Sequence, residues 1–273
     1  MGKNATYNLK LRLGAGEKAF GQMVGPGGEP AKIVKALKDL GDDFILLDTE
    51  HSLLNKETVF EYIQVCHEMD MPLLMRTEDK AAYFRCYLDA GVNGLMLPLV
   101  DTVEEAAHAV SMSYFPPIGH RGYSLGMSPY LIDFQSPNEV PVLTLTEYVN
   151  NNTMLFPQTE SLENISNLPR ILSLEGITGT IVGPFDLAFN IGGIDPKALA
   201  MDVVTSQAVE EKLREIVKIC QQAGKVAGIG GFTPQVLARW AKEGYNLLIV
   251  GYVLHGNVEA LRPLIEEAKA LIK

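Results

Sequence analysis

Two carboxylates and an imidazole follow directly on an apolar run in this chain. Residues 44–47 are FILL, and Asp48, Glu50 and His51 come immediately after them. A charged side chain inside a buried strand is costly unless it is paired, so such a cluster is expected only where the strand ends. A histidine is also a common general base near neutral pH. The stretch therefore predicts that this strand ends at a catalytic pocket.

Further strand-like runs end in residues that suit the same pocket: Arg76, Gln158, Glu160 and, in the GPFD motif at 183–186, Asp186. Glu160 and Asp186 follow different strands and suit a hard divalent cation, because Mg²⁺ and Mn²⁺ bind one or two protein carboxylates and leave other positions to water and substrate. Arg76 is suited to stabilising a developing oxyanion.

The turn before Asp186 is a candidate substrate-binding segment. It consists of Gly183, Pro184 and Phe185. Because backbone N–H groups at helix N-termini bind anions, we expect this turn to hold a substrate carboxylate.

Each of these residues, taken singly, also has an ordinary structural explanation. A lone carboxylate at a strand end often caps the next helix, an arginine often forms a salt bridge at a rim, and a histidine is often structural. Their gathering at the ends of several strands favours the functional interpretation.

The elements that must position these residues alternate along the chain. Apolar, strand-like runs lie at 19–25, 43–49, 72–77, 94–100, 153–160, 178–183, 225–230 and 246–252. Helical patterns follow near 30–40, 56–69, 79–90, 102–113, 161–173, 205–223, 233–243 and 257–272. Strands that are apolar on both faces and alternate with helices in this way predict an α/β fold, a (β/α)₈ TIM barrel, whose active sites lie at the C-terminal ends of the strands. A doubly wound sheet is the alternative, but it needs fewer strands.

The domain organisation is expected to be simple. We predict a single barrel domain over 1–273, because no linker divides the chain. The one long irregular segment lies near 114–152 and contains several Pro and Asn residues. Segments of this length in a compact domain are usually functional, so we interpret it as a lid or a subunit contact.

Composition narrows the partners and the compartment. The net charge of −10 disfavours nucleic acid and anionic membrane surfaces, which need basic patches. The three cysteines are widely spaced, which favours reduced thiols over disulfides or a zinc site. We find no membrane-length apolar run and no signal-peptide pattern, and therefore expect a cytoplasmic protein.

Several catalytic motifs are absent from the sequence. It contains no P-loop, no GxSxG and no HExxH, and GPGG at 25–28 is not a dinucleotide fingerprint. Schiff-base chemistry is disfavoured because Lys225, which begins a predicted strand, lies at the wrong end of the barrel.

Four motifs in this order give the chain a specific resemblance: DxEH at 48–51, PPxGxRG at 116–122, QxES at 158–161 and GPxDL at 183–187. Together they resemble the HpcH/HpaI family, the metal-dependent class II pyruvate aldolases that include 2,4-dihydroxyhept-2-ene-1,7-dioate aldolase. The resemblance runs over nearly the whole chain.

The resemblance implies a metal and a base. Glu160 and Asp186 are implied as the ligands of Mg²⁺, Mn²⁺ or Co²⁺, and Arg76 as the group that contacts the pyruvate oxygen. His51 is implied as the catalytic base, acting with a metal-bound water. Its implied partner is Asp89, from the family's LDxG stretch, a residue that the strand pattern alone does not select.

Other residues of the pocket are implied in supporting roles. Gln158 is implied near the substrate or a metal-bound water, and Asp48 and Glu50 behind the site. The family also implies a homo-oligomer, usually a hexamer. This chain departs from the family in its last two turns, GIGGF and GYVLHG, which border the pocket and put the aldehyde specificity in doubt.

The predicted activity is reversible aldol cleavage of a 4-hydroxy-2-oxo acid to pyruvate and an aldehyde. One alternative is an acyl-CoA lyase of the citrate lyase β or citramalyl-CoA lyase type, although CoA favours a basic mouth and the chain is acidic. A second alternative, outside enzymes, is a degenerate barrel used as a binding or assembly module.

Overall fold

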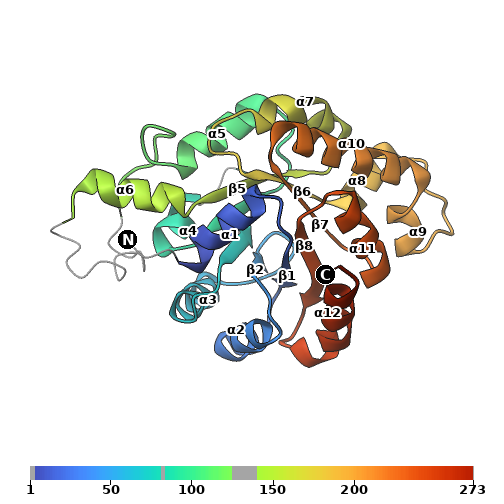
Figure 1. Cartoon of the computed structure of the whole chain (residues 1–273), viewed down its shortest axis with the longest axis horizontal. Coiled ribbons are helices and arrows are strands. Elements are labelled where there is room, and N and C mark those ends of the chain that lie inside the picture. The colour runs from blue at the N-terminus through green and yellow to red at the C-terminus, as the bar shows by residue number, and fades with distance from the viewer. Residues whose placement is uncertain (1–3, 81–83, 125–139, 273) are drawn as a thin grey trace.

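Eight parallel strands close into a barrel in the computed structural model, which describes residues 4–80, 84–124 and 140–272 (Figure 1). The strands are β1 (Ala19–Val24), β2 (Phe44–Asp48), β3 (Leu73–Arg76), β4 (Gly94–Leu97), β5 (Met154–Thr159), β6 (Gly179–Val182), β7 (Val226–Gly230) and β8 (Leu247–Val253). Each pairs with its neighbour in sequence, and β1 pairs with β8 to close the ring. The predicted (β/α)₈ barrel is confirmed.

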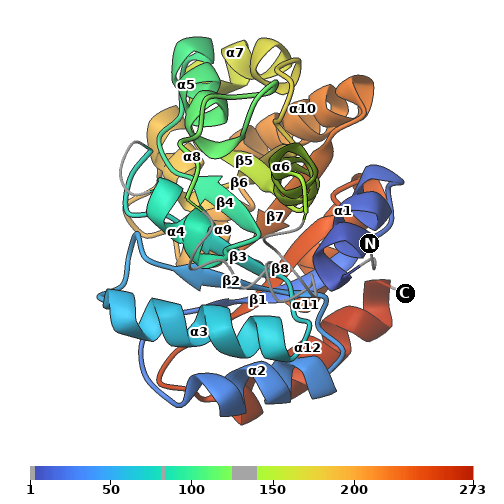
Figure 2. The ribbon, with the colours of Figure 1, turned by 90° about the vertical axis from the view of Figure 1, so that its left-hand side faces the viewer.

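Helices surround the barrel. They are α1 (Ala5–Gly14), α2 (Pro30–Asp39), α3 (Lys56–Glu68), α4 (Phe84–Ala90), α5 (Val103–Ser113), α6 (Val142–Asn151), α7 (Leu162–Leu172), α8 (Pro184–Ile191), α9 (Ala200–Val204), α10 (Gln207–Ala223), α11 (Pro234–Glu243) and α12 (Val258–Ile272). Figure 2 shows α3, α2 and α12 packed side by side on the outside. All the predicted helices are present, within the described residues, and their ends differ from the predictions by a few residues.

The barrel interior is apolar at one end and polar at the other. Alternate residues of each strand point inward, and on β2 these are Phe44, Leu46 and finally Asp48. Helix α1 closes the N-terminal end, where Leu9 and Leu13 pack against the inward-facing apolar residues (Figure 1). The opposite end is left to the polar residues that finish the strands.

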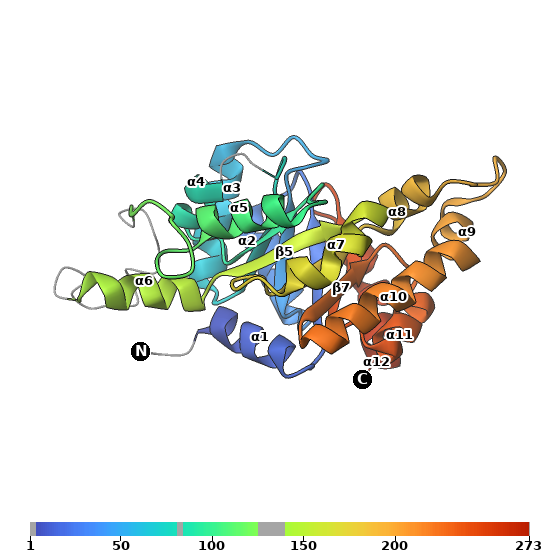
Figure 3. The same ribbon diagram turned by 90° about the horizontal axis from the view of Figure 1, so that it is seen from above.

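Four helices were not predicted: α1, α6, α8 and α9. Helix α6 corrects the irregular segment predicted near 114–152, because its residues 142–151 are helical and 125–139 lie outside the described residues. The helix packs Leu145, Tyr148 and Val149 against Phe115. Figure 3 shows α6 and α9 at opposite ends of the molecule.

A buried ion pair fastens α12 to the N-terminal end of the barrel. Lys269 Nζ lies 2.6 Å from Asp42 Oδ1 and also donates to the carbonyl oxygen of Leu40. Burial raises the pKa of Asp42, although the charge of Lys269 opposes the shift. None of the helices in the described part of the chain is long and apolar enough to cross a membrane.

Candidate active site

Strand β2 places Asp48 inside the C-terminal end of the barrel, where it organises its neighbours. Arg76, at the end of β3, donates from Nε to Asp48 Oδ1 and from Nη2 to Oδ2, both at 2.9 Å. Tyr252 of β8 donates its hydroxyl to Oδ2 at 2.7 Å. Burial opposes ionisation of Asp48, but the hydrogen bonds and the charge of Arg76 outweigh it, so the pKa of Asp48 is lowered. A fixed anion therefore orients the guanidinium.

The turn after β2 adds a second carboxylate and the histidine. The backbone N–H groups of Glu50 and His51 donate to Asp48 Oδ1 at 3.1 and 3.3 Å, which folds the turn over the strand end. Glu50 Oε2 lies 3.3 Å from Arg76 Nε and 3.5 Å from His51 Nε2. The imidazole side chain is 60% exposed, so it is accessible to a ligand in the pocket.

Strand β5 contributes an amide and a buried carboxylate. Gln158 donates from Nε2 to Glu160 Oε2, and the backbone N–H of Leu99 donates to Glu160 Oε1 at 2.8 Å. Gln158 Oε1 is buried and has no hydrogen-bond partner among the described residues. Leu99 adopts a positive φ of 54°, which is unusual for a leucine.

The turn after β6 fits closely against these two side chains. A Cβ at Gly183 would lie 2.6 Å from Gln158 Nε2 and 3.0 Å from Glu160 Oε2, so only glycine allows the approach. Pro184 is the first residue of α8, and Asp186 lies in the first turn of that helix. A carboxylate in the first turn is favoured by the helix dipole, which holds Asp186 at this rim.

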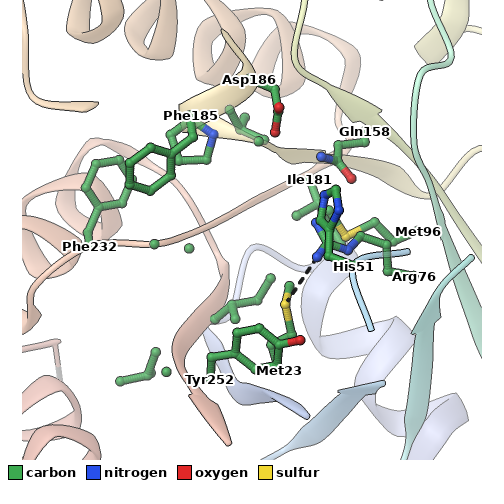
Figure 4. A pocket seen from close by; sticks show the side chains of 18 of the residues that line it. Met23, His51, Arg76, Met96, Gln158, Ile181, Phe185, Asp186, Phe232 and Tyr252 are labelled. Atoms are coloured by element: carbon green, nitrogen blue, oxygen red, sulfur yellow. Dashed lines mark hydrogen bonds between the residues drawn. The ribbon is translucent and has the colours of Figure 1, made fainter. Parts of the chain in front are cut away.

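These residues surround one cavity of about 570 Å³. His51, Arg76, Gln158, Gly183, Pro184, Phe185 and Asp186 all line it. Figure 4 shows the carboxylate of Asp186 and the amide of Gln158 pointing into the same space, with His51 and Arg76 beside them. Asp48 and Glu50 lie behind Arg76, and Glu160 lies behind Gln158. The structure thus brings together the predicted residues of β2, β3, β5 and α8.

The electrostatics of this rim suit a cation. Burial raises the pKa of Glu160 to about 7, and the nearby charges of Asp186 and Glu50 add to the shift. Burial likewise raises the pKa of Glu50, with Asp48 and Asp186 contributing. Converging carboxylates that repel one another are stabilised by a divalent ion between them.

The donor set fits a hard cation with few protein ligands. Among the described residues, no group of three or more His, Cys, Asp or Glu side chains is arranged as a metal site. The carboxylates of Glu160 and Asp186 and the unpartnered oxygen of Gln158 are the candidate oxygen ligands, and Glu160 would have to exchange a hydrogen bond from Gln158 or Leu99 for the ion. Mg²⁺ and Mn²⁺ accept such a set, because they keep several waters.

The family model described as HpcH/HpaI aldolase/citrate lyase matches residues 25–252. The chain belongs to this family. The 2-keto-3-deoxy-L-rhamnonate aldolase of Shigella dysenteriae serotype 1 (strain Sd197) is 28% identical over 247 residues, which cover 90% of this chain and 87% of that protein. The enzyme of the same name from Klebsiella pneumoniae subsp. pneumoniae is 30% identical over 212 residues, 77% of this chain and 74% of that protein.

A solved structure shares the fold. The HpcH/HpaI aldolase from Desulfitobacterium hafniense DCB-2 has a TM-score of 0.77 and 24% identity, and the match covers 97% of this chain and 96% of that one. The predicted family membership is therefore confirmed by sequence, and the barrel by structure.

Asp89, which the family resemblance paired with His51, lies elsewhere within this chain. It is near the end of α4, where Arg121 donates to its Oδ1 from Nη2 at 2.6 Å and from Nε at 3.2 Å. Its side chain lines a separate cavity of about 460 Å³ beside α3 and α4. Among the described residues, a carboxylate that lies close to the His51 ring is that of Glu50, with 3.5 Å between Nε2 and Oε2. A catalytic role for Asp89 in this HpcH/HpaI protein stays a prediction.

Some residues of the pocket were not predicted from the sequence. Tyr252 lines the cavity and binds Asp48, but in the sequence it is one more aromatic residue in an apolar strand. Met23 of β1 and Phe232 after β7 line the cavity as well. The inward-facing register of β1 and β8 is the signal that would have found Met23 and Tyr252.

Proposed function

We propose that this protein catalyses the metal-dependent, reversible cleavage of a 4-hydroxy-2-oxo acid to pyruvate and an aldehyde. The observation that carries the proposal is the arrangement of Arg76, Gln158 and Asp186 around one cavity, with Glu160 directly behind Gln158. The names of the relatives support an aldolase. A class II, metal-dependent reaction is the mechanism that the carboxylates favour.

The residues of the site divide the chemistry between them. Glu160 and Asp186 would hold the cation, which acts as a Lewis acid on the 2-oxo acid when bound. The guanidinium of Arg76, held flat against Asp48 by two hydrogen bonds, binds the oxygen that becomes negative as the C3–C4 bond breaks. His51 removes the proton of the C4 hydroxyl, and its exposure lets it exchange that proton with water.

The acyl-CoA lyase alternative has weaker support. The family description includes citrate lyase. Among the lining residues of the cavity, however, Arg76 is the sole fully charged cation, and the chain carries a net charge of −10. A CoA pyrophosphate needs more positive charge than this at its entrance.

We also propose, from the family resemblance, that the protein forms a homo-oligomer. We propose in addition that it is located in the cytoplasm.

Pyruvate release tests the proposal. The purified protein is mixed with a panel of 4-hydroxy-2-oxo acids and Mg²⁺, Mn²⁺ or Co²⁺, with and without EDTA. Glu160→Gln is compared with Glu163→Gln, the same substitution at an exposed position of α7. We expect EDTA and Glu160→Gln to abolish release, and Glu163→Gln to leave it intact.

Other outcomes would redirect the proposal. Release that survives EDTA would contradict the metal mechanism. No release from any member of the panel, together with cleavage of citramalyl-CoA, would favour the acyl-CoA lyase. No turnover of either substrate class would favour a barrel that only binds.

A further inference from the structure

The cavity has two unlike sides. One side carries the polar residues of β2, β3, β5 and α8 described above. The other is formed by β7, β8, α9, α11 and α12, and its side chains are largely apolar: Met201, Phe232, Pro234, Ile249, Val250 and Leu264. Figure 4 shows Phe185 and Phe232 together, across the cavity from His51, Arg76 and Gln158.

Glycines connect the two sides. Gly230 at the end of β7, Gly231 after it and Gly251 in β8 line the cavity, and they contribute no side chains to this part of its wall. Gly231 has a φ of +84°, which disfavours other residues there. The cavity therefore continues from the polar groups over the glycine turn to Met201 and Leu264.

The apolar side has few polar side chains that could bind a ligand, and its two hydroxyls are each partly used within the chain. The hydroxyl of Thr233 accepts from the backbone N–H of Val236 as the N-cap of α11. The proton of the Tyr252 hydroxyl is donated to Asp48. A ligand with several hydroxyl groups would lose its hydrogen bonds to water on this side and regain few of them, so each hydroxyl should lower kcat/KM by roughly 10- to 100-fold.

We propose that the aldehyde half of the substrate is apolar, either branched aliphatic or aromatic, so that the chain acts on 4-hydroxy-2-oxo acids with an apolar group on C4. The inference rests on the proposed aldol cleavage and names its substrate class. The 2-oxo acid end occupies the polar side, and the C4 substituent lies over Gly230 and Gly231 against Phe232 and Met201. The relatives are named for a deoxy sugar acid, which is a different class.

The proposed cleavage needs no reactant besides the substrate and a proton donor. In cleavage, the C3–C4 bond breaks, its electron pair stays on C3, and the C4 hydroxyl loses its proton to become the aldehyde. The pyruvate enolate then takes one proton at C3. In the reverse reaction, pyruvate adds to an aldehyde through the same steps in the opposite order. The aldehyde preference can therefore be measured from pyruvate and free aldehydes.

Matched aldehydes provide the test. Addition of pyruvate with Mg²⁺ is measured for propanal against lactaldehyde, which differ by one hydroxyl, and for 3-methylbutanal and benzaldehyde against glyceraldehyde. We expect kcat/KM for propanal to exceed that for lactaldehyde about tenfold or more. Each further buried methylene should raise kcat/KM about fourfold. Equal or higher kcat/KM for lactaldehyde or glyceraldehyde would overturn the proposal.

A second readout separates this inference from the proposed function. Exchange of the pyruvate methyl protons in D₂O, followed by NMR, reports enolisation without any aldehyde. Exchange with a preference for hydroxylated aldehydes would overturn the apolar class and leave the aldolase intact. Absence of both exchange and addition would overturn the aldolase, and the inference with it.

Two substitutions of Met201 test where the apolar substituent on C4 binds. Met201 is half-buried on the short helix α9, so its replacement disturbs little of the core. Met201→Gln should lower kcat/KM for 3-methylbutanal about fivefold or more relative to that for lactaldehyde, whereas Met201→Leu should keep the wild-type ratio. An unchanged ratio in Met201→Gln would contradict the placement of the C4 substituent.

Discussion

Asp42 lies just before β2 and Asp48 is its last residue, and each is buried beside a cation. Asp42 has one lysine, Lys269, and its Oδ2 lacks a hydrogen-bond partner among the described residues. Asp48 has a two-point contact with Arg76, the Tyr252 hydroxyl and two backbone N–H groups. Consequently the pKa of Asp42 is raised and that of Asp48 is lowered.

The difference shows what each pair contributes. The pair at the N-terminal end fastens α12 to the barrel, because Lys269 also donates a hydrogen bond to the carbonyl oxygen of Leu40. The pair at the C-terminal end borders a cavity and lies beside further carboxylates, Glu50, Glu160 and Asp186, which outnumber the one arginine. Buried charge alone therefore does not mark a functional site. In this protein, the candidate site is marked by an excess of negative charge beside an accessible cavity.

Removing the cation of each pair gives the largest expected contrast. Arg76→Met leaves Asp48 buried and ionised, which should lower the free energy of unfolding by about 3–5 kcal/mol and abolish pyruvate release. Lys269→Met should cost about 1–3 kcal/mol, because Asp42 can take up a proton, and should leave activity intact. Urea unfolding and the pyruvate assay measure both. An active Arg76→Met variant would refute the role given to the guanidinium.

A glycine-to-alanine change at the rim gives the next largest effect. The Cβ of Gly183→Ala would displace the ends of the Gln158 and Glu160 side chains, and activity should fall roughly 10- to 100-fold, as small misplacements near reacting groups do. Gly14→Ala is the matched control, because no atom lies within 4 Å of its Cβ. Equal activity of the two variants would mean that the close packing at Gly183 is not needed.

The affinity for a cation should depend on pH. Burial raises the pKa of Glu160 to about 7, so below that pH the carboxyl is protonated and must lose a proton before it can bind a metal ion. Affinity for Mn²⁺ should therefore fall as the pH falls, by about tenfold between pH 8 and pH 6. Titration calorimetry at the two values measures this. A pH-independent affinity would argue against Glu160 as a ligand.

Tyr252 gives the smallest contrast. Tyr252→Phe keeps the ring in the pocket and removes one hydrogen bond to Asp48, which should lower kcat/KM about threefold to tenfold. Tyr62→Phe is the control, because the buried hydroxyl of Tyr62 has no partner among the described residues and its removal should not destabilise the protein. A larger loss for Tyr62→Phe would reverse the comparison.

The sequence predicts the scaffold of this site better than its contacts. Strands of a parallel barrel are buried on both faces, so their apolar runs stand out, and the residues that end them are readily assigned to the rim. Arg76, Gln158 and Asp186 were found in this way and do line the cavity. The short helices α8 and α9 were missed because eight and five residues are too few for a helical repeat of apolar residues to stand out.

Contacts across the barrel could not be predicted from the sequence. The hydrogen bond from Tyr252 to Asp48 joins residues 204 positions apart. The N–H that holds Glu160 belongs to Leu99, whose side chain gives no sign of that role. The place of Asp89 beside Arg121 likewise depends on how the loop after α5 folds back onto α4. Such pairings follow from the closed fold and not from local pattern.

The binding of Mn²⁺ to the purified, metal-free protein tests the account most directly. Titration followed by electron paramagnetic resonance should show one site, lost in Glu160→Gln and in Asp186→Asn and retained in Glu163→Gln. That result would establish the carboxylates of β5 and α8 as the cation site. Binding that persists in both Glu160→Gln and Asp186→Asn, or no binding by the wild-type protein, would contradict it.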